Sequence, residues 1–344
     1  MKSGCYTAMV TPFDNNGIDE AGLVRLADFQ IQNGISGLLA VGTTGESPTL
    51  DWQEHHRVIE LYARQANGNC LCIAGTGSNN SREALSATRH AVAAGVDAVL
   101  LVDPYYNGPS SQEIRREYVA PVAAAFPDTT VIPYVIPGRT GAQLLPEDLA
   151  LLFKAHPNVN TVKEATGNLD NMRRTRACCG TEFSILSGDD GLLFDMMADE
   201  KIAAAGVISV VSNLAPRAMS DLVRLMAEKE IDAARKLADA LKPLFGLVTV
   251  TTREQSPYGA VVCRARNPLA LKTVMRLLGV PGGPCRPPLG KMSRGGLETV
   301  VEIVRSVQSS NPEILAPLAE FFNVDIEARL KDDRLLKGLY YPTY

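Results

Sequence analysis

The sequence predicts an α/β protein built on a (β/α)8 barrel, the TIM-barrel fold, with a C-terminal helical domain and an extra C-terminal tail. Eight short apolar or β-branched runs recur along the chain, amphipathic segments separate them, and the pattern after the eighth run is helical. A single barrel uses about 250 residues, which leaves roughly 90 for an appended part. We expect a barrel at residues 1–228, a helical domain at 229–311 and an extension at 312–344.

The eight runs are expected to be the strands of a parallel sheet, because each is followed by enough chain for a helical crossover. They are Tyr6–Val10, Gly37–Val41, Leu71–Ala74, Ala98–Val102, Thr130–Ile136, Thr161–Glu164, Phe183–Ser187 and Val207–Val211. Eight strands with helical crossovers favour a closed barrel. Counting alone leaves an open, doubly wound sheet as the alternative.

Helical segments separate the strands, and several of them begin with an Asp, Ser or Pro. We expect helices at Glu20–Asn33, Gln53–Ala66, Ser81–Ala94, Gln112–Ala125, Glu147–Lys154 and Gly191–Asp199. After the last strand we expect only helices, at Pro216–Ala227, Asp232–Leu244, Leu269–Leu278 and Leu297–Gln308.

The tail carries apolar residues at helical spacing, namely Ile314, Leu315, Leu318, Phe321 and Phe322. Left exposed, these side chains would form a sizeable apolar patch. We therefore expect the tail to pack on the barrel or across a subunit contact.

Charge and composition favour a small-molecule ligand. The net charge is −4, and no block of Lys and Arg suggests nucleic acid or an anionic membrane as a partner. No apolar stretch has the length of a signal peptide or a membrane span, so we expect a cytoplasmic protein. The seven cysteines and four histidines lack zinc-ligand spacing, so we expect reduced cysteines and no metal.

Lys163 is the leading candidate for catalysis. Active sites of such barrels lie at the C-terminal ends of the strands, and Lys163 falls in the expected strand Thr161–Glu164. An ammonium on the inner face would be poorly solvated, which lowers its pKa toward the neutral nucleophile that condenses with a ketone. The alternative is an ion pair with Glu164, but adjacent residues of a strand point to opposite faces.

Three hydroxyl side chains are candidates for proton transfer. Tyr134 lies on the preceding strand, and its phenol can shuttle protons while an imine forms. Thr43 and Tyr106 also follow strands, and their hydroxyls can relay that proton to solvent. A buried aromatic without a catalytic role is the alternative for Tyr134.

Two further groups suit an acidic substrate. Arg139 lies in a Pro-x-Arg-Thr-Gly loop after the fifth strand, and an arginine binds carboxylates through two hydrogen bonds. A surface ion pair is the alternative. Thr44 and the Gly45 turn can offer backbone N–H groups to a carboxylate, although Gly42–Ser47 lacks the Gly-Lys-Ser/Thr ending of a phosphate loop.

Taken together, these segments resemble the dihydrodipicolinate synthase family of the N-acetylneuraminate lyase superfamily, over roughly residues 4–311. The most specific matches are Gly42–Ser47, Pro104–Asn107, Tyr134–Gly141, Lys163–Asn168, Leu186–Asp190 and Gly206–Val210. The resemblance implies that Lys163 forms the Schiff base, that Tyr134, Thr43 and Tyr106 form the proton relay, and that Thr44, Arg139, Gly188 and Ile208 bind substrate. In the family the tyrosine that matches Tyr106 comes from a neighbouring subunit, which implies a dimer or a homotetramer.

The implied reaction condenses pyruvate with L-aspartate 4-semialdehyde to give 4-hydroxy-tetrahydrodipicolinate, on the way to diaminopimelate and lysine. It needs no cofactor or metal, because the protonated imine accepts the electrons. The alternative is another pyruvate-dependent class I aldolase, of the N-acetylneuraminate or keto-deoxy-sugar lyase type, which does not generally carry an arginine at the position of Arg139. A non-catalytic ligand-binding protein on the same barrel is the alternative from a different class.

The resemblance also implies feedback inhibition by L-lysine between paired subunits. The matching residues are Ser47, Trp52, His55, Asn79, Glu83 and Tyr105. Trp52 and His55 share a helix face that can instead be a plain subunit contact. Two features depart from the family pattern: Val135 replaces the usual Asn, and the tail has no counterpart.

Overall fold

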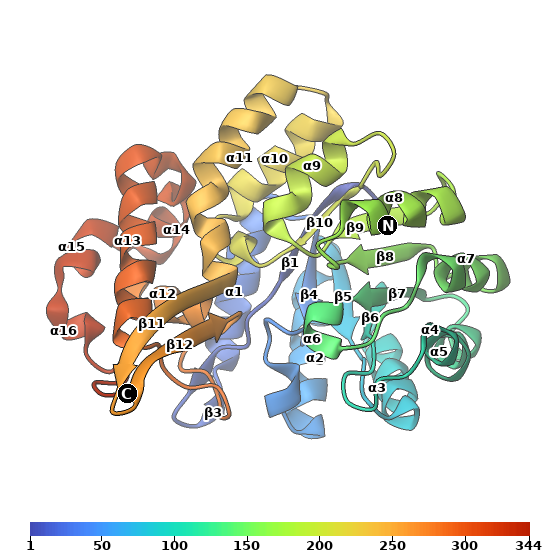
Figure 1. The fold of residues 1–344 in the computed structure, drawn as a ribbon, viewed down its shortest axis with the longest axis horizontal. Helices are drawn as coiled ribbons and strands as arrows, with labels where there is room; N and C mark the ends of the chain where they lie inside the picture. Colours follow the sequence, from blue (N-terminus) through green and yellow to red (C-terminus); the bar gives the residue numbers. More distant parts are fainter.

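The computed structural model describes residues 1–344 and contains a closed barrel of eight parallel strands (Figure 1). The strands follow the order β1-β10-β9-β8-β7-β6-β5-β4 around the barrel, and β1 closes it by pairing with β4. Their bounds are β1 Gly4–Ala8, β4 Gly37–Ala40, β5 Leu71–Gly75, β6 Ala98–Val102, β7 Thr130–Val135, β8 Thr161–Glu164, β9 Ser184–Ser187 and β10 Gly206–Ser209. The expected barrel is confirmed, and an open sheet is excluded.

The barrel interior is filled by side chains, so it is a packed core and not a pore. Ten buried apolar residues form this inner cluster, among them Tyr6, Leu39, Tyr134 and Ile208. A second, larger cluster of 80 buried residues lies between the strands and the surrounding helices and continues into the C-terminal region. The rigid barrel therefore holds the strand ends, where the candidate site lies.

Helices surround the barrel, most of them at the expected places. They are α1 Glu20–Gln32, α2 Trp52–Ala66, α3 Ser81–Ala93, α4 Ser111–Glu113, α5 Ala120–Ala125, α6 Pro137–Thr140, α7 Pro146–Ala155, α8 Leu169–Cys179, α9 Leu193–Ala198 and α10 Pro216–Ala227. A π-helical segment, Ile114–Val119, joins α4 to α5. The crossover helix α8 is absent from the helices expected above, because its polar sequence offers only a few apolar residues for burial, Met172 and Cys179 among them.

The expectation of a purely helical C-terminal region is wrong. Between α11 (Ile231–Phe245) and α12 (Leu269–Leu278), strands β11 (Thr249–Ser256) and β12 (Gly259–Arg266) form an antiparallel hairpin. Its β-branched residues and the turn at Pro257–Tyr258 are typical of a hairpin. The hairpin projects at the left of Figure 1, close to the C-terminus.

The remaining helices are α13 Arg294–Ser310, α14 Ala316–Phe322, α15 Ile326–Lys331 and α16 Asp333–Leu336. The tail packs on the barrel, as expected. The ring centroids of Phe321 and Phe322 lie 5.3 and 5.2 Å from that of Phe29 on α1, and Tyr340 pairs with Met292 in an isolated bridge. One continuous core therefore joins barrel, helices and tail, and the division at residues 228 and 311 stays a prediction.

No helix of the fold is both long enough and apolar enough to cross a membrane. All seven cysteines are free, and four of them are buried. No group of three or more His, Cys, Asp or Glu side chains is arranged to hold a metal ion.

Candidate active site

Lys163 lies on β8 and points into the barrel beside Tyr134 of β7. The two residues are register partners, and the lysine nitrogen Nζ lies 4.1 Å from the centroid of the Tyr134 ring. Only 4% of the lysine is exposed. A Cβ at Gly188 would lie 3.2 Å from the lysine Cε, so glycine leaves room for the long side chain. The Gly188 N–H donates to the Glu164 carbonyl at 2.7 Å, so it is already used within the protein.

The pKa of Lys163 is lowered to about 7, chiefly by burial and to a smaller extent by the positive charge of Arg139. The negative charge of Asp190 acts in the opposite direction. Glu164 does not pair with the lysine, because its carboxylate accepts from the Thr166 N–H at 2.7 Å and from Asn171 Nδ2 at 2.9 Å. The ion pair with Glu164 that was considered for Lys163 is therefore wrong. With a pKa of about 7, a large share of the lysine amine is neutral near pH 7.

Asp190 is a member of the site that the sequence argument did not single out. Its Oδ2 accepts from the backbone N–H groups of Val210 and Val211, each at 3.0 Å, and its Oδ1 has no partner. Burial raises the pKa of this carboxyl group. The signal for it was the pair of acids in Leu186–Asp190, at the end of β9. Its negative charge favours the protonated form of Lys163.

Tyr134 and Thr43 are brought together, as expected for a proton relay. Burial raises the pKa of Tyr134 to about 12, whereas Arg139 and a hydrogen bond with Thr43 lower it. The phenol therefore stays protonated at neutral pH and can donate as well as accept. Tyr106 does not join them within one chain, because 87% of it is exposed.

The turn Gly42–Ser47 is held in an unusual conformation. Val41, just before the turn, and Glu46, within it, have positive φ angles of 47° and 56°, which are uncommon for residues other than glycine and are often found at functional sites. The Gly45 N–H donates to the Gly42 carbonyl, so Gly45 is not available for a carboxylate. The N–H groups of Thr43 and Thr44 have no acceptor in the protein and can bind one.

Arg139, Thr44 and Asn267 form a small network at the rim. Arg139 Nη2 donates to the backbone carbonyl of Asn267 at 3.1 Å, and Asn267 Nδ2 donates to Thr44 Oγ1 at 2.9 Å. Arg139 forms no ion pair and donates to a backbone carbonyl instead, so the surface ion pair considered for it is wrong. Asn267 comes from the segment before α12, 128 residues after Arg139 and 223 after Thr44, and it was not predicted from the sequence.

A cavity of about 230 Å³ reaches Arg139 and the ring of Tyr134, against which the Lys163 amine packs, although Lys163 itself does not line it. Its lining includes Thr43, Tyr134, Arg139, Ser47 and Tyr105. This volume suits small acids of a few carbon atoms. Ile208 is buried in the inner wall of the barrel with Tyr134, and Val135 is buried on the outer side, so the departure from the family at Val135 leaves the catalytic groups in place.

Of the residues expected to bind lysine, Ser47 and Tyr105 line this cavity, whereas Trp52, His55, Asn79 and Glu83 do not. The Tyr105 N–H donates to Asn79 Oδ1 at 2.7 Å, and Glu83 accepts from Ser78 Oγ at 2.6 Å. The rings of Trp52 and His55 contact each other, with centroids 5.1 Å apart. Burial lowers the pKa of His55 to about 4, so this imidazole is neutral at pH 7.

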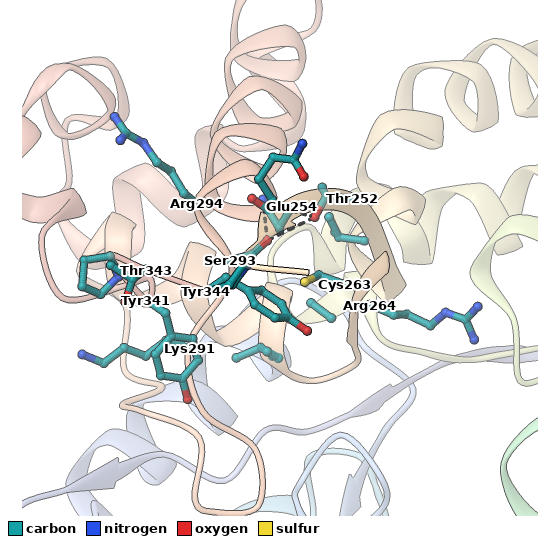
Figure 2. A pocket seen from close by; sticks show the side chains of 17 residues that line it. Thr252, Glu254, Cys263, Arg264, Lys291, Ser293, Arg294, Tyr341, Thr343 and Tyr344 are labelled. Carbon is teal, nitrogen blue, oxygen red and sulfur yellow. Dashed lines mark hydrogen bonds between the residues drawn. The ribbon is translucent and has the colours of Figure 1, made fainter. Parts of the chain in front are cut away.

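A larger cavity lies elsewhere in the molecule. Its volume is about 940 Å³, and it lies between the hairpin, the segment before α13 and the last four residues of the chain (Figure 2). Its one acidic side chain, Glu254, is held by Thr252 and Ser293. No buried lysine or other activated nucleophile faces it. The smaller cavity beside Lys163 is therefore the candidate active site.

Comparison with known proteins identifies the family of the chain. Residues 1–307 match the model of the dihydrodipicolinate synthetase family. The 4-hydroxy-tetrahydrodipicolinate synthase of Pelobacter propionicus is 39% identical over 306 residues, which cover 89% of this chain and 99% of the relative. Among solved structures, the 4-hydroxy-tetrahydrodipicolinate synthase of Methylacidiphilum fumariolicum SolV aligns with a TM-score of 0.83 at 35% identity, over 92% of this chain and 99% of the other. The synthase of Cyanidioschyzon merolae, solved with lysine bound, aligns with a TM-score of 0.80 at 30% identity, over 89% of this chain and 98% of the other.

Proposed function

Because this chain belongs to the dihydrodipicolinate synthetase family, we propose that Lys163 is the residue that forms the imine in its reaction. The reaction condenses pyruvate with L-aspartate 4-semialdehyde to give 4-hydroxy-tetrahydrodipicolinate, in the pathway to diaminopimelate and lysine. The observation that carries the role of Lys163 is its position. It is a buried amine with a pKa of about 7, beside Tyr134 at the mouth of the barrel.

The chemistry follows from these groups. Neutral Lys163 attacks the keto carbon of pyruvate, and loss of water from the carbinolamine gives the imine. Tyr134, in contact with Thr43, donates and recovers the proton that this dehydration requires. The protonated imine then loses a proton from the methyl group to form an enamine, whose carbon attacks the aldehyde. The electron sink is the imine itself, so the proposed mechanism uses no cofactor or metal.

Two sites for carboxylates are proposed. The free N–H groups of Thr43 and Thr44 suit the carboxylate of pyruvate, close to the imine. Arg139 lies farther out on its loop and suits the carboxylate of the aldehyde substrate. Gly188 and Ile208 are proposed to shape the wall against which pyruvate packs. A guanidinium without an ion-pair partner favours an acidic second substrate over the sugar aldehydes of related lyases.

The relay is proposed to be completed by a second copy of this chain. Tyr106 is 87% exposed, although it adjoins Tyr105 at the cavity, and a large exposed aromatic side chain suits a subunit contact. We expect a homo-oligomer, a dimer or a homotetramer, in which Tyr106 enters the site of its neighbour.

Feedback inhibition by L-lysine is proposed at the neighbouring residues Ser47, Trp52, His55, Asn79, Glu83 and Tyr105. The relative from Cyanidioschyzon merolae was solved with lysine bound, and the chemistry here suits an amino acid. Glu83 can pair with an ammonium, and Trp52 can cover an aliphatic chain. A cytoplasmic location fits the free cysteines and the biosynthetic reaction.

The substrate assignment is tested by assaying the purified protein with pyruvate and L-aspartate 4-semialdehyde, beside a separate assay for N-acetylneuraminate cleavage. We expect condensation in the first assay and no pyruvate release in the second. The Lys163→Arg variant, which keeps the charge but not the nucleophile, should be inactive. Cleavage of N-acetylneuraminate without condensation would place the chain among the sugar lyases instead.

A further inference from the structure

The loop that carries Arg139 is fixed from outside the barrel, by the base of the hairpin. Arg266, the last residue of β12, donates from Nη2 to the Gly138 carbonyl at 3.2 Å. In the opposite direction, Arg139 donates to the carbonyl of Asn267, the residue after Arg266. The short helix α6 and the end of β12 therefore hold each other by two hydrogen bonds that start from neighbouring arginines.

The hairpin base is itself well anchored. Arg266 faces Thr249 in the register of β11 and β12, and the Asn267 N–H donates to the Val248 carbonyl at 2.8 Å. Farther along, Thr252 Oγ1 lies 3.1 Å from Ser293 Oγ at the start of α13. Arg266 thus stands on a supported strand end, which can hold a loop in place.

The two guanidinium groups have no anion between them. Neither Arg139 nor Arg266 takes part in an ion pair with a carboxylate, and each is close enough to the other that the charge of Arg266 adds to burial in lowering the pKa of Arg139. Two like charges at one side of a reaction cavity repel each other, and an anion bound beside them relieves that repulsion. The arrangement is therefore complementary to a substrate that carries a carboxylate.

We propose that Arg266 is a specificity-determining positioning residue: it holds the Gly138–Arg139 turn and adds a second positive charge there, so that the site selects an aldehyde bearing a carboxylate. This inference rests on the proposed function, because it assigns Arg139 to the carboxylate of the second substrate. Arg266 is half-buried and acts through Arg139 and through its charge, without contact with the reacting carbon atoms.

The test compares Arg266→Ala, Arg266→Lys and the control Arg264→Ala in steady-state kinetics. Arg264 lies two residues earlier on the same strand, is exposed and makes no hydrogen bond to the loop of Arg139; its loss removes the same charge from the hairpin. In Arg266→Ala we expect the KM for aspartate semialdehyde to rise about ten-fold, the loss typical of one charge-assisted hydrogen bond. The KM for pyruvate and the rate of borohydride trapping with pyruvate alone should stay unchanged.

Arg266→Lys keeps the charge and one donor, so it should recover a large part of the loss. The inference is overturned if Arg266→Ala leaves the KM for the aldehyde unchanged, if it slows trapping with pyruvate to the same extent, or if Arg264→Ala has the same effect. Trapping distinguishes this failure from a failure of the proposed function. If the wild-type protein forms no borohydride adduct with pyruvate, the function itself is wrong, whereas normal trapping with an unaffected Arg266→Ala variant rejects only the role of Arg266.

Discussion

Lys163 is buried and lies near one positive and one negative side chain, and together these influences give an amine that can react at neutral pH. Burial and Arg139 favour the neutral form, and Asp190 favours the charged form. The resulting pKa of about 7 leaves the amine partly neutral, whereas a solvated lysine is almost fully protonated at this pH. The residues around it thus set the protonation state on which imine formation depends.

The first prediction concerns the pH dependence of imine formation. Only the neutral amine attacks pyruvate, so the trapping rate should rise with pH through about 7 and then level off. Asp190→Asn removes the negative charge that raises the pKa of Lys163. In this variant the trapping rate should therefore rise at a lower pH than in the wild-type protein. Single-turnover trapping between pH 5 and pH 9 measures both curves. A rise centred near pH 10 would show that Lys163 is solvated and would contradict the structure.

The same pKa shift has a consequence for stability. Between about pH 7 and the unfolded value near ~10.4, the unfolded chain holds a proton on Lys163 that the native chain lacks. The contribution of this lysine to the free energy of unfolding therefore rises with pH across that window. It is least favourable below pH 7, where the buried ammonium lacks water.

Part of the site could be predicted from the sequence. Lys163 and Tyr134 are polar residues inside apolar strands, and Arg139 follows a strand directly, so position alone suggested their roles. Asn267 and Arg266 reach the same rim through the hairpin base, which local patterns do not reveal. Tyr106 was named from the family resemblance, and a single chain does not bring it to the site.

At the level of elements, a buried ion pair connects α12 to the turn that carries Thr43 and Thr44. Lys272 and Glu46 form a fully buried ion pair at 2.5 Å, and the lysine also donates to the carbonyls of Thr11 and Pro284. Arg286 adds a backbone N–H to the second oxygen of Glu46 at 2.9 Å. The C-terminal helices therefore support the catalytic turn directly.

The second prediction tests this support. Lys272→Met removes one partner of the buried pair and should lower the free energy of unfolding by about 3–5 kcal/mol, because the Glu46 carboxylate is left buried and unpaired. The double variant Lys272→Met with Glu46→Gln should lose less than the sum of the two single variants. Urea denaturation measures all three. Arg294→Met, at an exposed ion pair with Glu298, is the control and should change stability by less than about 1 kcal/mol.

The hairpin shows why helices and strands were harder to tell apart in the part of the chain that follows the barrel. Its residues alternate between more and less exposed positions, but the less exposed face is only partly buried, so the sequence lacks a strong apolar alternation. Glu254, Gln255 and Arg264 also occur readily in helices. Within the barrel, by contrast, the strands are buried on both faces and stand out as short apolar runs.

At the scale of the whole molecule, the tail extends the core of the barrel. Ile314, Leu318, Phe322 and Leu330 are buried in the same cluster as Phe29 of α1. This contact joins residues about 290 positions apart, so the sequence showed that the tail needed a partner but not which surface it covers.

The third prediction follows from that contact. Deleting residues 312–344 should lower the melting temperature by several degrees and expose apolar surface around Phe29, with increased binding of a hydrophobic dye. The substitution Lys331→Ala, at an exposed pair in the tail, is the control and should have little effect. If the truncated protein keeps the wild-type melting temperature and binds no more dye, the tail does not stabilise the barrel.

The fourth prediction concerns regulation between copies of the chain. Millimolar L-lysine should reduce the activity of the wild-type protein, and Glu83→Ala should be resistant because the ammonium loses its carboxylate. Binding of lysine and of substrate should influence each other reciprocally. Activity and calorimetry together test this proposal. Undiminished activity in lysine, with no heat of binding, would assign these residues to the subunit contact alone.

The central claim, that Lys163 is the amine that condenses with pyruvate, is tested most directly by chemical trapping. The protein is incubated with pyruvate and borohydride, digested, and analysed by mass spectrometry, with Lys163→Arg treated in parallel. We predict one reduced three-carbon adduct, located on Lys163, and no adduct on the variant. An adduct on a different lysine, or none on the wild-type protein, would contradict the account.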